Sequence, residues 1–141
     1  MDINCLERFI EAQELVYTVA LREIGAGQKV SHWMWYIFPQ LRGLGKSAMA
    51  HTYGISGVEE AKRYLSHPLL SARLIEICRV LLTHCDKKSE EILGSTDAMK
   101  LRSSMTLFAL VSDEGSVFHE VLKVFYNGQM DDRTIRLIDI I

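Results

Sequence analysis

The side chains best suited to bind a ligand are concentrated in residues 24–58, a stretch without Asp or Glu although the chain has 18 acidic residues. An even distribution would place about four or five acids there, so the stretch is locally positive. It contains both tryptophans and several cations, namely Lys29, Trp33, Trp35, Arg42 and Lys46. Indole rings can stack on flat groups, and nearby cations attract anions. The pattern predicts a site for an anionic ligand with a flat part, such as a nucleotide-like metabolite.

Polar side chains add hydrogen-bonding groups to the same stretch. They are His32, Gln40 and Ser47. The sequence Gly45-Lys46-Ser47 matches the end of a phosphate-binding P-loop, but Gln40 stands where that loop requires a glycine. A nucleoside triphosphatase of this type is therefore excluded. A looser cradle of backbone N–H groups around an anion, at residues 44–47, remains open.

A second polar group lies within an otherwise apolar predicted helix. It consists of Lys100, Ser103, Ser104 and Thr106. Small hydroxyl residues allow helices to approach closely and can bond to the carbonyl four residues earlier. The functional alternative is that they line a pocket, where a serine nucleophile would need His32 as its base. The candidate catalytic residues are then His32, Ser103 and Ser104, and the protein would be a hydrolase or group transferase.

Gln13 lies in the apolar stripe of the first predicted helix, so its amide must find hydrogen-bond partners in the core or on a ligand. The complete set of candidate ligand-binding residues is Gln13, Lys29, Trp33, Trp35, Gln40, Arg42, Lys46, Ser47, Lys100 and Thr106. The five histidines are scattered, and the three cysteines form no CxxC pair. We therefore expect no metal site, and no motif indicates a cofactor.

The composition, with 48% hydrophobic and 24% charged residues, is typical of a soluble globular protein. The first residues do not have the pattern of a secretory signal, and unpaired cysteines fit a reducing compartment, so we expect a cytoplasmic protein. The longest uncharged apolar run, around residues 33–41, is too short to span a membrane. A net charge of −2 argues against nucleic-acid binding. The expected partner is an anionic small molecule, and the composition leaves the oligomeric state open.

The elements that must position these residues are helices. Apolar residues recur at three- and four-residue steps in residues 3–24, 69–82, 96–111 and 116–126, with shorter helical segments between them. Alternating patterns of the kind that predict strands do not accumulate. The sequence predicts an all-α fold, a single compact domain over residues 1–141 with about six to eight helices and no significant sheet.

Several sequence blocks resemble a bacterial family known as domain of unknown function eighteen-ten. They are Ser31-His32-Trp33-Met34-Trp35, Phe38-Pro39-Gln40, Gly43-Leu44-Gly45 and Ser103-Ser104-Met105-Thr106-Leu107-Phe108. The resemblance extends over nearly the whole chain and implies a compact, mainly α-helical domain without an established activity. Some members carry a calpastatin-like label, but calpastatin inhibitory segments are disordered in isolation, whereas this chain has aromatic-rich amphipathic helices.

Three interpretations follow for the aromatic stretch. It lines a pocket for an anionic metabolite, it anchors a protein partner through Trp33 and Trp35, or residues 32–38 are simply a core helix with solvated cations beside it. A concave, polar-lined cavity favours the first interpretation, whereas a flat exposed aromatic patch favours the second.

Overall fold

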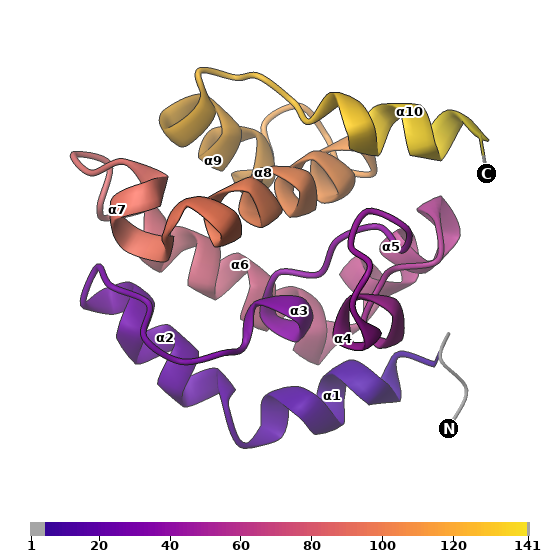
Figure 1. The fold of residues 1–141 in the computed structure, drawn as a ribbon, viewed down its shortest axis with the longest axis horizontal. Coiled ribbons are helices and arrows are strands. Elements are labelled where there is room, and N and C mark those ends of the chain that lie inside the picture. Colours follow the sequence, from indigo (N-terminus) through magenta and orange to yellow (C-terminus); the bar gives the residue numbers. More distant parts are fainter. Residues whose placement is uncertain (1–4, 141) are drawn as a thin grey trace.

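The predicted helical pattern forms ten helices within residues 5–140, the part of the chain that this computed structural model describes (Figure 1). The helices are α1 (Glu7–Glu14), α2 (Tyr17–Gly25), α3 (Met34–Ile37), α4 (Ala48–Thr52), α5 (Val58–Ser66), α6 (Pro68–Leu82), α7 (Ser89–Leu93), α8 (Ser95–Leu110), α9 (Val117–Tyr126) and α10 (Asp132–Ile140). The all-α class is confirmed. In the described residues, β pairing is limited to one isolated bridge between Leu41 and Ile55.

The helix count exceeds the expected six to eight because one predicted helix is divided and several single-turn helices form. The stretch predicted as one helix over residues 3–24, whose first two residues lie outside the described part, breaks between α1 and α2. At the break the backbone N–H of Val16 bonds to the carbonyl of Gln13, three residues earlier, and Leu15 is 87% exposed. The tighter turn redirects the chain, so the apolar stripe continues on a second helix axis.

Other helix ends follow the local signals in the sequence. Helix α3 ends before Pro39, because proline disfavours helical geometry in the residue that precedes it. His67 ends α5 and also begins α6, since its Nδ1 accepts hydrogen bonds from the N–H groups of Leu69 and Leu70. Pro68 is the first residue of α6, where its missing N–H costs nothing.

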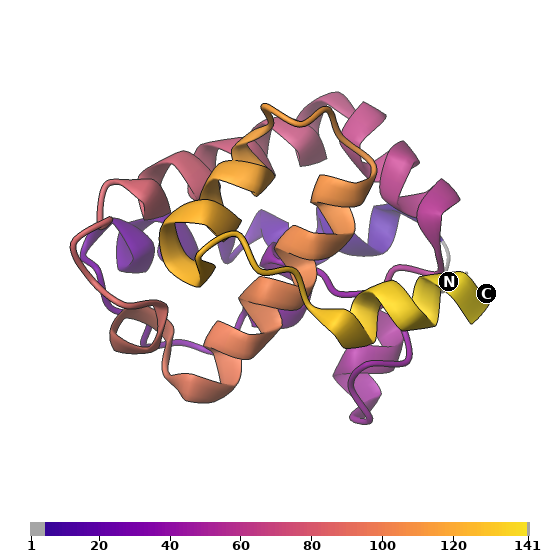
Figure 2. The same ribbon diagram turned by 90° about the horizontal axis from the view of Figure 1, so that it is seen from above.

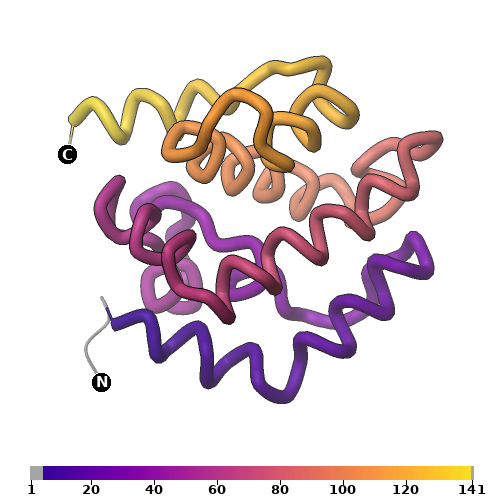
Figure 3. Tube along the Cα trace, turned by 180° about the vertical axis from the view of Figure 1, so that it is seen from behind, coloured from indigo at the N-terminus to yellow at the C-terminus, as the bar shows by residue number. Residues whose placement is uncertain are grey.

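Helix α6 forms the centre of the arrangement. It packs against α2 on one side and α9 on the other, and α8 contacts α5, α7, α9 and α10. Figure 3 shows α6 passing between the α1–α2 pair and the α8–α9 pair. None of the helices in residues 5–140 combines the length and apolar character needed to cross a bilayer.

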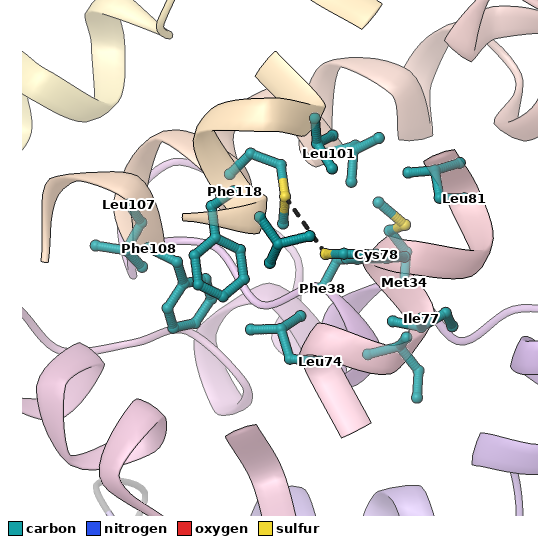
Figure 4. Close-up of a cluster of buried hydrophobic side chains, with 14 of the residues drawn as sticks. Met34, Phe38, Leu74, Ile77, Cys78, Leu81, Leu101, Leu107, Phe108 and Phe118 are labelled. Carbon is teal, nitrogen blue, oxygen red and sulfur yellow. Dashed lines mark hydrogen bonds between the residues drawn. The ribbon is translucent and has the colours of Figure 1, made fainter. Parts of the chain in front are cut away.

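The main core lies where α6, α8 and α9 meet, and residues of the aromatic stretch complete it. Leu74, Cys78 and Phe108 are buried there, and the Sγ of Cys78 lies 3.7 Å from the Sδ of Met105 (Figure 4). Met34 and Phe38 enter the same core from the α3 segment. Within residues 32–38, the stretch that the third interpretation makes a core helix, Trp33, Met34, Ile37 and Phe38 are buried, whereas His32 is exposed and Trp35 and Tyr36 keep partial exposure.

A buried ion pair fixes the segment that supports one wall of the candidate site. The Nη1 of Arg8 lies 3.0 Å from the Oε2 of Glu60, and both side chains are almost fully buried. Arg8 also donates to the carbonyls of Thr52 and Gly54, while Glu60 accepts from the N–H of Ser56. A buried charge pair is stable only when its remaining donors and acceptors are satisfied, as they are here. The pair thereby joins α1, α5 and residues 52–56.

Candidate functional site

Gln40 from the first polar group of the sequence, and Lys100 and Ser103 from the second, line a cleft of about 230 Å³. It lies between the connection that follows α3, one face of α8 and the start of α10, which Figure 2 shows beside α8. The cleft is lined by Gln40, Leu44, Gly45, Thr96, Met99, Lys100, Arg102, Ser103, Asp131 and Arg133.

The first wall is the Gln40–Gly45 connection, which is held by the short pairing with Ile55. The N–H of Ile55 donates to the carbonyl of Gln40 at 2.8 Å, and the N–H of Arg42 donates to the carbonyl of Ile55 at 2.7 Å. Gly45 allows close approach to α4, because a Cβ at this position would lie 2.7 Å from the Cβ of Ala50. Backbone pairing and the absence of a side chain thus fix the path of this wall.

The second wall is the connection between α9 and α10, which α8 holds in place. Arg102 donates from Nε to the carbonyl of Gln129 and from Nη2 to that of Met130, each at 2.9 Å. One turn later, the Oγ1 of Thr106 accepts a bond from the N–H of Asp131 at 2.9 Å. The two α8 side chains therefore bind three successive residues of the connection and set the position of α10.

Asp131 precedes α10 and caps it. Its Oδ2 accepts from the N–H of Thr134 at 3.1 Å, from the Oγ1 of Thr134 at 2.5 Å and from the Oγ of Ser103 at 3.1 Å. No hydrogen bond from residues 5–140 reaches its Oδ1, which is not among the buried unpartnered atoms. Oδ2 therefore serves the fold, whereas Oδ1 is accessible on a side chain that lines the cleft.

The charges lining the cleft are mainly positive. Lys100, Arg102 and Arg133 face one carboxylate, that of Asp131. Within the described part of the chain, neither arginine has a carboxylate within ion-pair distance, and Arg133 bonds to the carbonyl of Leu44. Carbonyl partners leave a guanidinium charge uncompensated, so the lining carries a net positive charge.

Lys100 connects the cleft to Trp35 and to a second lysine. Its Nζ lies 5.3 Å from the centre of the Trp35 ring and 3.6 Å from the Oδ1 of Asp97. The other oxygen of Asp97 is 2.9 Å from the Nζ of Lys29, so this carboxylate is shared between the two lysines. A change in the position of Lys100 would therefore alter the environment of Trp35.

Only some of the candidate site residues predicted from the sequence lie at the cleft. Gln40, Lys100 and Ser103 line it, and Trp35 borders an adjoining narrow crevice that Gln40 and Gly45 share. The other candidates are absent from its lining.

Lys29 and Trp33 serve the fold. Trp33 is only 1% exposed, and its Nε1 donates to the Oε1 of Glu23 at 2.9 Å. Burial would raise the pKa of Glu23, but hydrogen bonds from Ser31, Val30 and Trp33 outweigh it and lower the pKa to about 2. The Nζ of Lys29 lies 4.8 Å from the Trp33 ring centre while it pairs with Asp97. A buried, hydrogen-bonded Trp33 cannot stack on a ligand.

The other residues predicted to bind a ligand lie outside the cleft lining. The Nε2 of Gln13 donates to the carbonyl of Tyr36 and to the hydroxyl of Tyr64, so its partners lie in the core. The Nε of Arg42 donates to the carbonyl of His51. Thr106 is fully buried and bonds as described above, Lys46 is exposed, and Ser47 caps α4 through the N–H of Ala50.

The predicted serine–histidine pair is not formed. The hydroxyl of Ser103 bonds to the carbonyl of Met99 and to Asp131. The hydroxyl of Ser104 is fully buried and has no hydrogen-bond partner among residues 5–140, whereas His32 is exposed. Ser103 and Thr106 behave as helix residues with a structural role, because the hydroxyl of each donates to the carbonyl four residues earlier. In residues 5–140, no group of three or more metal-ligating side chains is gathered.

Sequence reasoning missed several residues of the cleft. They are Thr96, Met99, Arg102, Asp131 and Arg133. Arg102 lies between Lys100 and Ser103 in the sequence and could have been predicted together with them. Asp131 and Thr134 have the spacing of a helix cap, which would have placed Arg133 in the first turn of α10. The contact between Arg133 and Leu44, which is almost ninety positions earlier, could not be predicted from the local sequence.

Comparisons with known proteins agree with this fold. A family model described as a protein of unknown function (DUF1810) matches residues 3–138. The chain is similar to a crystal structure of the conserved hypothetical protein Rv1873 from Mycobacterium tuberculosis, with 46% sequence identity and a TM-score of 0.94. That similarity covers 99% of this chain and 100% of the other. A comparison with curated proteins gives no match.

Proposed function

Because the chain belongs to the DUF1810 family, whose description names no activity, we propose its function from the cleft: the protein binds a small anionic ligand there. The observation that carries the proposal is the group of three cations, Lys100, Arg102 and Arg133, around one cavity of a protein with a net charge of −2. A cationic cluster on an acidic chain is a local feature rather than a consequence of composition. Guanidinium groups match the geometry of phosphate and carboxylate, so these are the expected anionic groups.

The size of the cleft limits the ligand. Pockets for drug-sized molecules usually measure about 300–1,000 Å³. A cavity of about 230 Å³ suits a metabolite smaller than a complete nucleotide. The burial of Trp33 points the same way, because it removes one of the two indoles expected to stack on a base. We therefore favour a small phosphorylated or carboxylated metabolite over the nucleotide-like ligand that the sequence suggested.

Tryptophan fluorescence provides the test, because the Nζ of Lys100 lies 5.3 Å from the Trp35 ring centre. Titration with inorganic phosphate and small phosphorylated metabolites should give a saturable change in emission. Arg133→Gln should weaken binding about tenfold, since a charge-assisted hydrogen bond contributes roughly 1.5–3 kcal/mol. Arg136→Gln is the matched control, because Arg136 lies on the same helix but outside the cleft. Equal affinities of the two variants, or no response to any compound, would contradict the proposal.

The alternative function, a protein-interaction module anchored by Trp33 and Trp35, has weaker support. An anchor must be exposed before it binds, and Trp33 is 1% exposed with its indole N–H already bonded. Trp35 is only partly exposed and has Lys100 over its ring. The concave, charged cleft thus favours a small ligand over a flat protein partner.

A further inference from the structure

Resting on the proposed anion site, we propose that the ligand is a phosphorylated polyol such as a sugar phosphate. Its phosphate binds the cations, and at least one of its hydroxyl groups donates to Asp131. The cleft is not uniformly positive, because the Asp131 carboxylate lies among Lys100, Arg102 and Arg133. A site for a bare anion gains nothing from a carboxylate in its lining, since like charges repel. The ligand should therefore also carry a hydrogen-bond donor.

The two oxygens of Asp131 have different roles, which makes this inference specific. Its Oδ2 is occupied by Ser103 and Thr134, as the cap of α10 requires. Its Oδ1 accepts no bond from the described residues and belongs to a cleft-lining side chain. An ionised carboxylate oxygen accepts hydrogen bonds and cannot donate them, so it selects a donor on the ligand.

The neighbouring groups favour a hydroxyl over an ammonium as that donor. Three cations line the same small cavity, so a cationic group on the ligand would be repelled. Gln40 and Ser103 also line the cleft, and Ser103 uses its single proton on Met99 and Asp131. The oxygen of Ser103 can then accept a hydrogen bond from a second hydroxyl group of the ligand. A polyol, whose hydroxyls both donate and accept, matches this set.

Asp131→Asn separates recognition of the hydroxyl from recognition of the phosphate. An asparagine carbonyl can replace Oδ2 in the helix cap, while its NH₂ group replaces the acceptor Oδ1 with a donor. Asp132→Asn is the matched control, because it removes the same charge from the adjacent, exposed residue. Thermal unfolding of both variants establishes that the cap is retained.

Isothermal titration calorimetry would compare inorganic phosphate with glycerol phosphate, ribose phosphate and glucose phosphate. We expect at least one polyol phosphate to bind about tenfold more tightly than inorganic phosphate, the effect of one hydrogen bond to a charged group. Asp131→Asn should abolish that advantage without weakening the binding of inorganic phosphate, and Asp132→Asn should change neither.

The outcomes separate this inference from the proposal on which it rests. If all compounds bind equally and Arg133→Gln weakens them all, the anion site holds and the polyol inference is overturned. The inference is also overturned if Asp131→Asn leaves the preference for polyol phosphates intact. If none of the phosphates binds, both the anion site and the polyol inference fail.

Discussion

Replacing Glu23 with Gln should make the stability of the protein less dependent on pH. The Oε1 of Glu23 accepts bonds from the N–H groups of Val30 and Ser31 and from Trp33, each at 2.9 Å. Its Oε2 accepts from the hydroxyl of Ser31 at 2.6 Å. One carboxylate thereby attaches the connection between α2 and α3 to the end of α2. Glutamine keeps the shape but loses the charge that strengthens these bonds.

The magnitude follows from the pKa of Glu23, which is lowered from 4.5 to about 2 because the hydrogen bonds to the carboxylate outweigh the effect of burial. A pKa that is lower in the folded state stabilises the protein above the unfolded value, and this contribution is lost as the pH falls from 4.5 towards 2. The shift corresponds to at most about 3.4 kcal/mol. Because the side chain is only partly buried, screening by solvent should reduce this to about 1–2 kcal/mol.

Urea unfolding followed by circular dichroism at several pH values between 7 and 3 would measure this effect. The wild type should be more stable than Glu23→Gln by about 1–2 kcal/mol at pH 7, and the difference should shrink below pH 4.5. Glu11→Gln is the control, because Glu11 is exposed and should show no such difference. A difference that stays constant down to pH 3 would refute the assignment of the stabilisation to the Glu23 charge.

Three further predictions concern buried groups. Arg8→Ala removes the close, buried partner of Glu60 and leaves only the exposed Arg63 at 3.8 Å, so it should cost about 3–5 kcal/mol in denaturant unfolding, whereas Arg63→Ala should cost less than about 1 kcal/mol. Ser104→Ala removes a buried hydroxyl that has no partner in the described part of the chain, so stability should be unchanged or rise by up to about 1 kcal/mol, and a clear loss would mean that the hydroxyl is hydrogen-bonded in solution. Burial raises the pKa of the Cys78 thiol, so a thiol reagent at pH 8 should modify only the other two cysteines until urea exposes the third.

The helices could be predicted from the sequence because their signals are local. Pro39 ends α3, His67 and Pro68 separate α5 from α6, and Ser116 caps α9 through the N–H of His119. The break between α1 and α2 was missed, since the apolar spacing continues through it. The chain changes direction at a tighter turn, where the N–H of Val16 bonds to the carbonyl of Gln13, and hydrophobic periodicity alone does not predict such a turn.

The candidate site was only partly predictable, because the absence of acids along the chain does not imply their absence in space. Lys29 pairs with Asp97 on α8, and Trp33 bonds to Glu23, which lies just before the acid-free stretch. These two residues consequently belong to the framework. The cations that line the cleft, Lys100, Arg102 and Arg133, come from α8 and α10 instead.

The cleft also shows which variants can test function without disturbing the fold. Arg102 and Thr106 hold the connection before α10, and the Oδ2 of Asp131 caps that helix, so truncating any of them would alter stability and binding together. The ammonium of Lys100 instead has a distant partner at 3.6 Å, in a carboxylate that Lys29 binds at 2.9 Å. Lys100→Gln should therefore weaken anion binding with little change in unfolding free energy, since the carboxylate of Asp97 keeps its closer partner Lys29. A large loss of stability in this variant would mean that Lys100 belongs to the framework, and Arg133 would then be the better probe of the site.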